Sequence, residues 1–347
     1  MHSVPKGQEI KCNTSIAAGN FSWNLINGDV FDQSFGILPH WVSARFAGIG
    51  NVSYPFSILR NTSFKKLAPI IEAFKVFLQI PGKSSVWFYN INALNATLIY
   101  LLRTFKPSVK LNAIVLDYTP DNPKNARYLS LINACHGRIC LASTDEFNSV
   151  NSVCLPGVTS AEVKDAPKIT EISWDFLISG MLGENISSLT TLLKVFSRHP
   201  ELRLHITGMK ADETLIKSFT DQHPNIIYYG QSSFEKYREL LTKCPFLLST
   251  RNVNYPENRC NFPSKIIEGL VNNRIIISTI HYPQLGRIKY LEVGNDEAAF
   301  EDNLLRIASM NKEVLLTFAN QESATRESFN VGVWNKVMSD IENYRAK

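Results

Sequence analysis

The chain alternates between short apolar runs and amphipathic stretches, and this alternation constrains its fold more than any other feature. In the second half, the apolar runs are ISWDFLISG, LRLHITG, NIIYYG, PFLLST and RIIIST, and stretches with helical spacing separate them. Continuous apolar runs are typical of strands buried on both faces of a parallel sheet, and such strands need helical crossovers. The pattern therefore predicts βαβ units and an α/β fold.

The first half shows the same alternation less clearly. Helical spacing runs from Lys65 to Leu78, and SSVWFYN, LNAIVLDY and GRICLAS have the composition of strands. The first sixty residues, rich in glycine and aromatic side chains, predict loops around short strands. A stretch of little periodicity at 158–170 predicts a linker. We therefore expect two Rossmann-like, doubly wound domains, at 1–157 and 171–325, which face one another across a cleft.

Length and composition agree with two domains. The chain has 347 residues, of which 44% are hydrophobic and 19% charged, enough to bury two cores. A net charge of +5 is too small for a dedicated nucleic-acid binder. It suits a protein that handles anionic substrates or rests on an anionic membrane, and equally a slightly basic soluble protein. The six cysteines form no C-x-x-C pair, and MHSVPKGQEIKCN has no apolar core, so we expect a cytoplasmic protein with reduced thiols.

One segment, NFPSKIIEGLVNNRIIIST, has the features of an anion site. Pro263 is expected at the first position of a helix, whose free N–H groups and dipole favour a phosphate. Ser264 and Lys265 add a hydroxyl and an ammonium in the first turn. Glu268 lies one turn further, where its carboxylate can accept hydrogen bonds from both hydroxyls of a ribose. The alternative is an ordinary solvated ion pair between Lys265 and Glu268.

Four segments, in order along residues 176–279, resemble the C-terminal half of GT-B glycosyltransferases, in particular the large glycogen-synthase-like family four. They are FLISGMLGEN, LRLHITGMK, NIIYYGQSSFEKYRELLTKCPFLLST and NFPSKIIEGLVNNRIIIST. The resemblance implies a GT-B fold, and a last helix at 326–347 that crosses back to the N-terminal domain. It also implies transfer of a sugar, with retention, from a nucleotide diphosphate, for which UDP is the expected carrier.

The resemblance also suggests site residues. Family four usually has two glutamates separated by seven residues; Glu268 fits the second, whereas Cys260 occupies the first position. Glu257 is therefore the candidate catalytic carboxylate, unless the donor sugar is held differently. Asp117, at a strand end, is expected to touch the donor sugar or the acceptor, although a plain turn residue is an equal alternative. The expected donor-binding residues are Gly180, Gly183, Lys210, Gln231, Arg251, Ser264, Lys265 and Glu268.

On the acceptor side, Asp32 and His40 are candidates for a base or a ligand, with ordinary loop residues as the alternative. The expected acceptor is a saccharide or a lipid-linked oligosaccharide, and a bacterial surface-polysaccharide pathway would suit it. The helices at 65–78 and 94–105 carry lysines and arginines beside aromatic residues. The resemblance suggests that they contact the inner face of a membrane, whereas ordinary core helices with a basic face are the alternative.

No cofactor and no essential metal are expected, because a helix N-terminus and cations can offset the charge of the departing diphosphate. Two other functions remain open: a nucleotide-sugar epimerase of the same fold, and a non-catalytic protein that binds a nucleotide sugar. A Rossmann oxidoreductase is disfavoured, because no G-x-G-x-x-G follows a strand.

Overall fold

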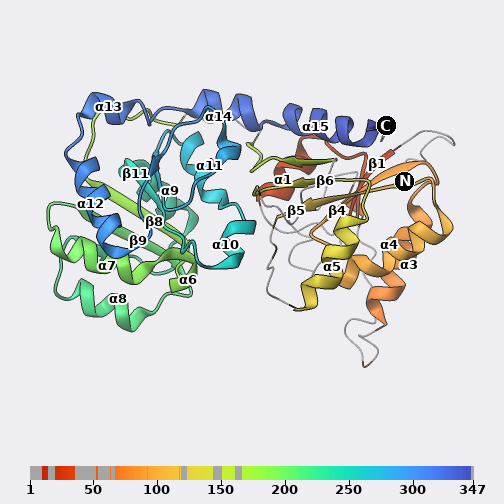
Figure 1. Ribbon diagram of the computed structural model, residues 1–347, viewed down its shortest axis with the longest axis horizontal. Helices are drawn as coiled ribbons and strands as arrows, with labels where there is room; N and C mark the ends of the chain where they lie inside the picture. The colour runs from red at the N-terminus through yellow and green to blue at the C-terminus, as the bar shows by residue number, and fades with distance from the viewer. Residues whose placement is uncertain are drawn as a thin grey trace. The chain divides into compact units, whose positions relative to one another are not determined.

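The computed structural model describes residues 10–14, 20–35, 52–53, 63, 67–91, 93–116, 118, 123–143, 151–160 and 166–344. The chain forms two compact units (Figure 1). The first, the N-terminal unit, comprises Met1–Ala161 together with Phe329–Lys347. The second, the C-terminal unit, comprises Glu162–Ser328. The chain therefore passes from the first unit to the second and then returns.

The N-terminal unit is built on a parallel sheet with the order β3-β2-β1-β4-β5-β6-β7. The order reverses direction between β1 and β4, as in a Rossmann fold. Its strands are β1 (Ile10–Thr14), β2 (Gln33–Phe35), β3 (Val52–Ser53), β4 (Ser84–Tyr89), β5 (Lys110–Val115), β6 (Gly137–Cys140) and β7 (Ser152–Cys154). Its helices are α1 (Asn20–Asn27), α3 (Ala68–Gln79), α4 (Ala93–Phe105), α5 (Pro123–Asn133) and α15 (Val331–Asn343).

The C-terminal unit has a second parallel sheet, with the order β10-β9-β8-β11-β12-β13. This is again the Rossmann order, and its direction reverses between β8 and β11. Its strands are β8 (Asp175–Met181), β9 (Arg203–Met209), β10 (Ile226–Tyr228), β11 (Phe246–Ser249), β12 (Ile275–Ser278) and β13 (Leu291–Glu292). Both sheets confirm the predicted fold class of two Rossmann-like α/β domains.

Helices cover both faces of the C-terminal sheet, because successive side chains of each strand point to opposite faces. One face packs with α7, α8 and α12 into a core that includes Phe176, Phe196 and Phe246. The other face meets α9 and α11. The helices of this unit are α6 (Glu184–Ser187), α7 (Leu189–Arg198), α8 (Glu213–Thr220), α9 (Phe234–Lys243), α10 (Pro256–Cys260), α11 (Ser264–Val271), α12 (Glu297–Ala308), α13 (Lys312–Leu316) and α14 (Glu322–Phe329).

Three local predictions are wrong. The polar composition of RNVNYPENRCN, after PFLLST, predicts a loop, but this segment contains a short helix, α10, which Pro256 begins. Pro263 is the N-cap of α11 and not its first helical residue. Helical spacing from about Glu322 to Tyr344 also predicts a single helix. The structure has two, because Asn330 takes an extended conformation and its side chain accepts a hydrogen bond from the Val333 amide. An asparagine N-cap begins a new helix in this way.

The C-terminal helix α15 is part of the N-terminal unit. Trp334 is fully buried, and its indole Nε1 donates to the carbonyl oxygen of Gly157 at 2.8 Å. From the body of the unit, Trp87 Nε1 donates to the Glu342 carboxylate at 2.6 Å, and Lys110 Nζ donates to the Glu342 carbonyl oxygen at 2.8 Å. Among the helices formed by the described residues, none is long and apolar enough to cross a membrane.

Candidate functional site

The most promising place for a ligand in the C-terminal unit is the carboxyl edge of its sheet, beside β8 and β11. In open α/β sheets, ligands bind outside the carboxyl ends of the strands where the strand order reverses. The loop after β8 leads into α6, and the loop after β11 leads through α10 into α11. These two loops frame the candidate site.

The predicted donor-binding residues all follow carboxyl ends of this sheet or end its strands. Gly180 is the second-last residue of β8, and Gly183 is the N-cap of α6. Lys210 follows β9, and Gln231 follows β10; both side chains are exposed. The remaining donor-binding residues follow β11: Arg251, Ser264, Lys265 and Glu268. Glu257, the candidate catalytic carboxylate, also follows β11, in α10.

Helix α11 is held against the sheet by its apolar residues. Ile266, Ile267 and Leu270 are buried, and a Cβ atom at Gly269 would lie 2.5 Å from a Leu247 methyl group and 2.6 Å from one of Ile276. No side chain caps the first turn, because the N-cap is a proline. The N-terminus of this helix therefore keeps backbone amides for an anion, with the positive end of the helix dipole behind them.

Lys265 and Glu268 form an ion pair, as the alternative interpretation expected, but the pair is not on an open surface. Lys265 Nζ lies 2.7 Å from Glu268 Oε2, and the two side chains are only 35% and 27% exposed. The ammonium also lies 4.1 Å from the centroid of the Tyr237 ring, which α9 contributes. Cation–π contact of this kind favours a fixed ammonium position.

Beneath this pair, serine and tyrosine hydroxyls line the carboxyl edge. Phe176 of β8 pairs with Phe246 of the parallel strand β11. Ser179 and Ser249 each follow three residues later, so they occupy equivalent positions on the two strands. The hydroxyl oxygens of both serines are buried without a hydrogen-bond partner, as is that of Tyr237. Buried polar atoms are nearly always paired in native proteins, so this cluster at the candidate site is unusual.

The loops after β8 and β11 are tied together by amide side chains that the sequence analysis did not single out. Asn258, buried in α10, donates to the carbonyl oxygens of Asn185 and Asn252, each at 2.8 Å. Asn185 Nδ2 donates to the Tyr255 hydroxyl at 2.6 Å. Arg251 lies beside the same network, with Nη1 3.4 Å from Asn258 Oδ1. A polar loop composition was the only signal for this arrangement in the sequence.

Glycines lie near the carboxyl ends of three neighbouring strands, β8, β9 and β10. Gly180 and Gly208 are paired across β8 and β9, and Gly208 N donates to the carbonyl oxygen of Gly230 at 3.0 Å. Gly180 and Gly230 have positive φ angles, 108° and 61°, which side chains disfavour. A Cβ atom at either would meet no atom within 4 Å. This part of the edge is therefore bare backbone, which a ligand can approach closely.

A buried hydrogen-bonded line, Asp175–His205–Tyr229, begins at the opposite edge of the sheet. His205 Nε2 donates to Asp175 Oδ1 at 2.9 Å, and Nδ1 lies 2.9 Å from the Tyr229 hydroxyl. Burial lowers the pKa of His205, although Asp175 opposes this. Burial acts to raise the pKa of Asp175, but hydrogen bonds from His205 and Ser173 and the charge of Arg203 lower it overall. The line is thus a buried histidine held between a carboxylate and a tyrosine hydroxyl.

In the N-terminal unit, the structure describes Asp32, one of the two acceptor-side candidates. It immediately precedes β2, at the amino edge of the sheet, and its Oδ2 accepts a hydrogen bond from the Lys11 amide at 2.7 Å. Its carboxylate is thus engaged in joining β1 to the start of β2. The other two candidates of this unit, His40 and Asp117, lie outside the described residues.

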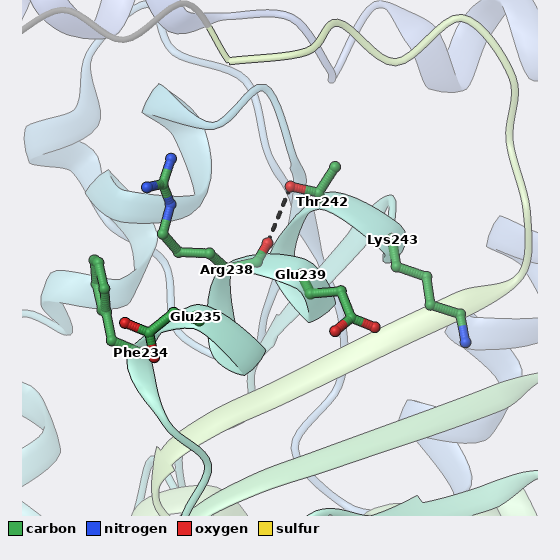
Figure 2. A pocket seen from close by; sticks show the side chains of 6 residues that line it. All are labelled: Phe234, Glu235, Arg238, Glu239, Thr242 and Lys243. Atoms are coloured by element: carbon green, nitrogen blue, oxygen red, sulfur yellow. Dashed lines mark hydrogen bonds between the residues drawn. The ribbon is translucent and has the colours of Figure 1, made fainter.

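Three hollows on the described surface lie away from this edge. One of about 690 Å³ lies over the outer face of α9 (Figure 2). Its lining comes from one helix: Phe234, Glu235, Arg238, Glu239, Thr242 and Lys243. A hollow between side chains of a single helix is open on every other side, so we assign it no ligand. Within the described ranges, no group of three or more His, Cys, Asp and Glu side chains could hold a metal ion.

Comparison with known proteins supports the fold and nothing narrower. No protein-family model and no curated protein matches this chain. An E. coli structure described as trehalose-6-phosphate bound with UDP-2-fluoro glucose has a TM-score of 0.66 and 9% identity, covering 97% of this chain and 100% of its own. A glycosyltransferase from Rickettsia africae has a TM-score of 0.65 and 12% identity, covering 97% of this chain and 100% of its own.

The GtfA/B complex is also similar, with a TM-score of 0.57 and 12% identity over 78% of this chain. This chain covers only 60% of that chain's length. Identities this low establish the fold alone. The predicted GT-B glycosyltransferase fold is therefore confirmed, whereas the narrower resemblance to family four remains a prediction.

Proposed function

We propose that this protein is a glycosyltransferase that takes a sugar from a nucleotide diphosphate, UDP being the expected carrier, in the manner of family four. The observation that carries the proposal is the position of Lys265 and Glu268. They lie on the first turns of α11, beside the point where the strand order reverses, and they rest on Tyr237. A GT-B fold and an uncapped helix N-terminus at that edge support it.

In the proposed reaction, the diphosphate lies at the N-terminus of α11, where the helix dipole, Lys265 and Arg251 offset the charge that develops on departure. The carboxylate of Glu268 accepts hydrogen bonds from the two ribose hydroxyls. Glu257, half-buried in α10, makes no hydrogen bond or ion pair with any described residue and supplies a carboxylate toward the sugar. No metal is required for charge neutralisation, and retention at the anomeric carbon is the expected outcome.

A first prediction concerns nucleotide binding. UDP at 100 times its dissociation constant should stabilise the protein by about 2.7 kcal/mol, which raises its melting temperature. Glu268→Ala should abolish this increase, because the ribose hydroxyls lose their acceptor. The measurement is thermal unfolding with each of the common nucleoside diphosphates, followed by calorimetric titration of the one that stabilises most.

Glu239→Ala is the matched control, because Lys236 and Glu239 form a second i,i+3 pair, at 2.8 Å, on the outer face of α9. Glu239 is 63% exposed and lines the surface in Figure 2. This variant should respond to UDP as the parent does. The proposal is overturned if no nucleoside diphosphate or nucleotide sugar stabilises the parent protein.

A non-catalytic binding protein is the second candidate, and Cys260 is the observation that favours it. Cys260 occupies the position of the family's first glutamate, and a cysteine has no carboxylate to offer the sugar. Its side chain is also buried, with 3% exposed. The two functions differ in turnover. A transferase releases nucleoside diphosphate when donor and acceptor are both present, whereas a binding protein releases none. An epimerase would convert the sugar without any acceptor.

The proposed acceptor is a saccharide or a lipid-linked oligosaccharide, and helix α3 supports contact with a membrane. Its large apolar side chains point outward, whereas its buried face carries smaller side chains and one glutamate. An ordinary surface helix buries its large apolar side chains instead. The inward residues Ala68, Ala73 and Val76 are buried, together with the carboxylate-bearing Glu72. The exposed apolar side chains are Leu67, Ile70, Ile71, Phe74 and Leu78, joined by Tyr100 and Phe105 of α4.

The charge of this region also favours contact with a membrane. Between Leu67 and Lys110 the chain has five lysines and arginines, and its single acidic residue, Glu72, is 1% exposed. Lys75 of α3, Lys83 shortly after α3 and Arg103 of α4 are exposed. An apolar face with a basic border suits an anionic lipid surface, which gains about 1 kcal/mol from each nearby cation.

A second prediction follows from this face. The protein should sediment with vesicles of phosphatidylcholine and phosphatidylglycerol, and less with phosphatidylcholine alone or in high salt. The double variant Ile70→Ser/Phe74→Ser should bind about tenfold more weakly, because two apolar anchors are lost. Leu305→Ser/Val314→Ser is the control, since these side chains are exposed in the other unit. Equal sedimentation of both variants, or none of the parent, would rule out the proposed contact.

A further inference from the structure

Tyr237 lies at the centre of the Lys265–Glu268 arrangement. It belongs to the buried face of α9, and 9% of its surface is exposed. The face of its ring lies 4.1 Å from the Lys265 ammonium, and that ammonium is bonded to the Glu268 carboxylate at 2.7 Å. One aromatic side chain from a neighbouring helix thus supports both charged residues of the candidate site.

The Tyr237 hydroxyl makes no well-formed hydrogen bond within the protein. Its oxygen is buried and has no hydrogen-bond partner, and the neighbouring Ser179 hydroxyl has none either. Burial, and secondly the negative charge of Glu268, raise the pKa of Tyr237, so the hydroxyl keeps its proton. Ser179 and Glu268 lie close enough for weak hydrogen bonding with this hydroxyl, but neither meets it at the distance and angles of a well-formed hydrogen bond.

We propose that Tyr237 is a positioning residue for the nucleotide, whose ring seats Lys265 and whose hydroxyl donates to Glu268 when a ribose is bound. This inference rests on the proposed function, because it assumes a diphosphate near Lys265 and a ribose at Glu268. A diphosphate draws the Lys265 ammonium toward the start of α11 and away from Glu268. The carboxylate then needs another donor, and the Tyr237 hydroxyl is the protonated group beside it.

The physical reason is the geometry that a vicinal diol demands. A carboxylate has two oxygens with about four acceptor directions, and two ribose hydroxyls use adjacent ones. A donor from the protein on the remaining side fixes the rotation of the carboxylate, so that its free lone pairs meet the diol. Such an arrangement also explains why a buried tyrosine hydroxyl is kept unpaired here, where phenylalanine would pack equally well.

The test compares UDP with its 2′,3′-dideoxy analogue by calorimetric titration. Tyr237→Phe should bind UDP about tenfold more weakly than the parent, while its affinity for the dideoxy analogue stays unchanged. Tyr237→Leu, which also removes the ring, should weaken both ligands, because Lys265 loses its seat. Tyr228→Phe is the control: it removes one hydroxyl at the end of β10, on the face that packs with α8.

The outcomes are separable from those of the proposed function. If the parent binds no nucleotide, the proposed function itself fails. If the parent binds UDP and Glu268→Ala does not, but Tyr237→Phe binds UDP as tightly as the parent, only the role of Tyr237 is refuted. Equal weakening of both ligands in Tyr237→Phe would indicate a purely structural role and would also refute it. Because a buried hydroxyl without a well-formed hydrogen bond costs free energy, the melting temperature of Tyr237→Phe should equal or exceed that of the parent.

Discussion

Trp334→Ala should lower the free energy of unfolding of the N-terminal unit by about 3–5 kcal/mol. The indole is fully buried and bonded to the Gly157 carbonyl oxygen. Its removal leaves a large cavity and an unpaired acceptor, and α15 loses its main anchor. Urea unfolding monitored by circular dichroism measures the change, with each transition fitted separately, because two units need not unfold together.

The control lies on the same helix. Lys336 is exposed on α15, so Lys336→Ala should change the free energy of unfolding by less than about 0.5 kcal/mol. Trp334→Phe should lie between the two, since it keeps most of the apolar contact but not the hydrogen bond. A change below about 1 kcal/mol in Trp334→Ala would mean that α15 contributes little to the unit.

Gly208→Ala should destabilise the C-terminal unit by about 3 kcal/mol. A Cβ atom at this position would lie 2.1 Å from the carbonyl oxygen of Gly180, and backbone cannot move aside as a side chain does. The pairing of β8 with β9 must open at the carboxyl edge, so UDP affinity should fall together with the melting temperature. Chemical unfolding and nucleotide titration of the same preparation measure both effects.

Gly183→Ala is the matched glycine. Its φ of −66° is ordinary, and a Cβ atom would meet nothing within 4 Å. Stability should therefore stay within about 0.5 kcal/mol of the parent. If the diphosphate approaches this backbone, UDP should nevertheless bind more weakly. A stable Gly208→Ala protein would show that the strand ends are not packed as described.

The sequence predicts the parallel α/β fold because the buried strands are nearly continuous apolar runs. PFLLST and RIIIST, for example, become β11 and β12 with every residue of each strand buried. It does not predict β1, since IKCNT is short and polar, and its pairing with β2 and β4 makes it a strand. Asn330 breaks the last helix through a capping bond that helical spacing does not reveal.

For the candidate site, sequence patterns predict which residues follow strands but not what they touch. The spacing of Lys265 and Glu268 is compatible with either a nucleotide site or a solvated pair. Only the packing of α9 against α11 brings Tyr237 beneath them. Likewise, the apolar spacing of 65–78 predicts a helix, yet it cannot say that the apolar side faces outward while Glu72 faces in. Orientation of this kind depends on contacts between distant segments.

The return of the chain to its first unit also affects how the protein is made. The N-terminal unit needs Trp334 and Glu342, yet these residues follow the whole of Glu162–Ser328 in the sequence. On a ribosome that adds about 5–20 residues per second, the first unit waits on the order of ten seconds for its last helix. During this interval Trp87 and the Gly157 carbonyl lack their final partners. The C-terminal unit, which is continuous in sequence, can therefore finish folding before the unit that emerged first.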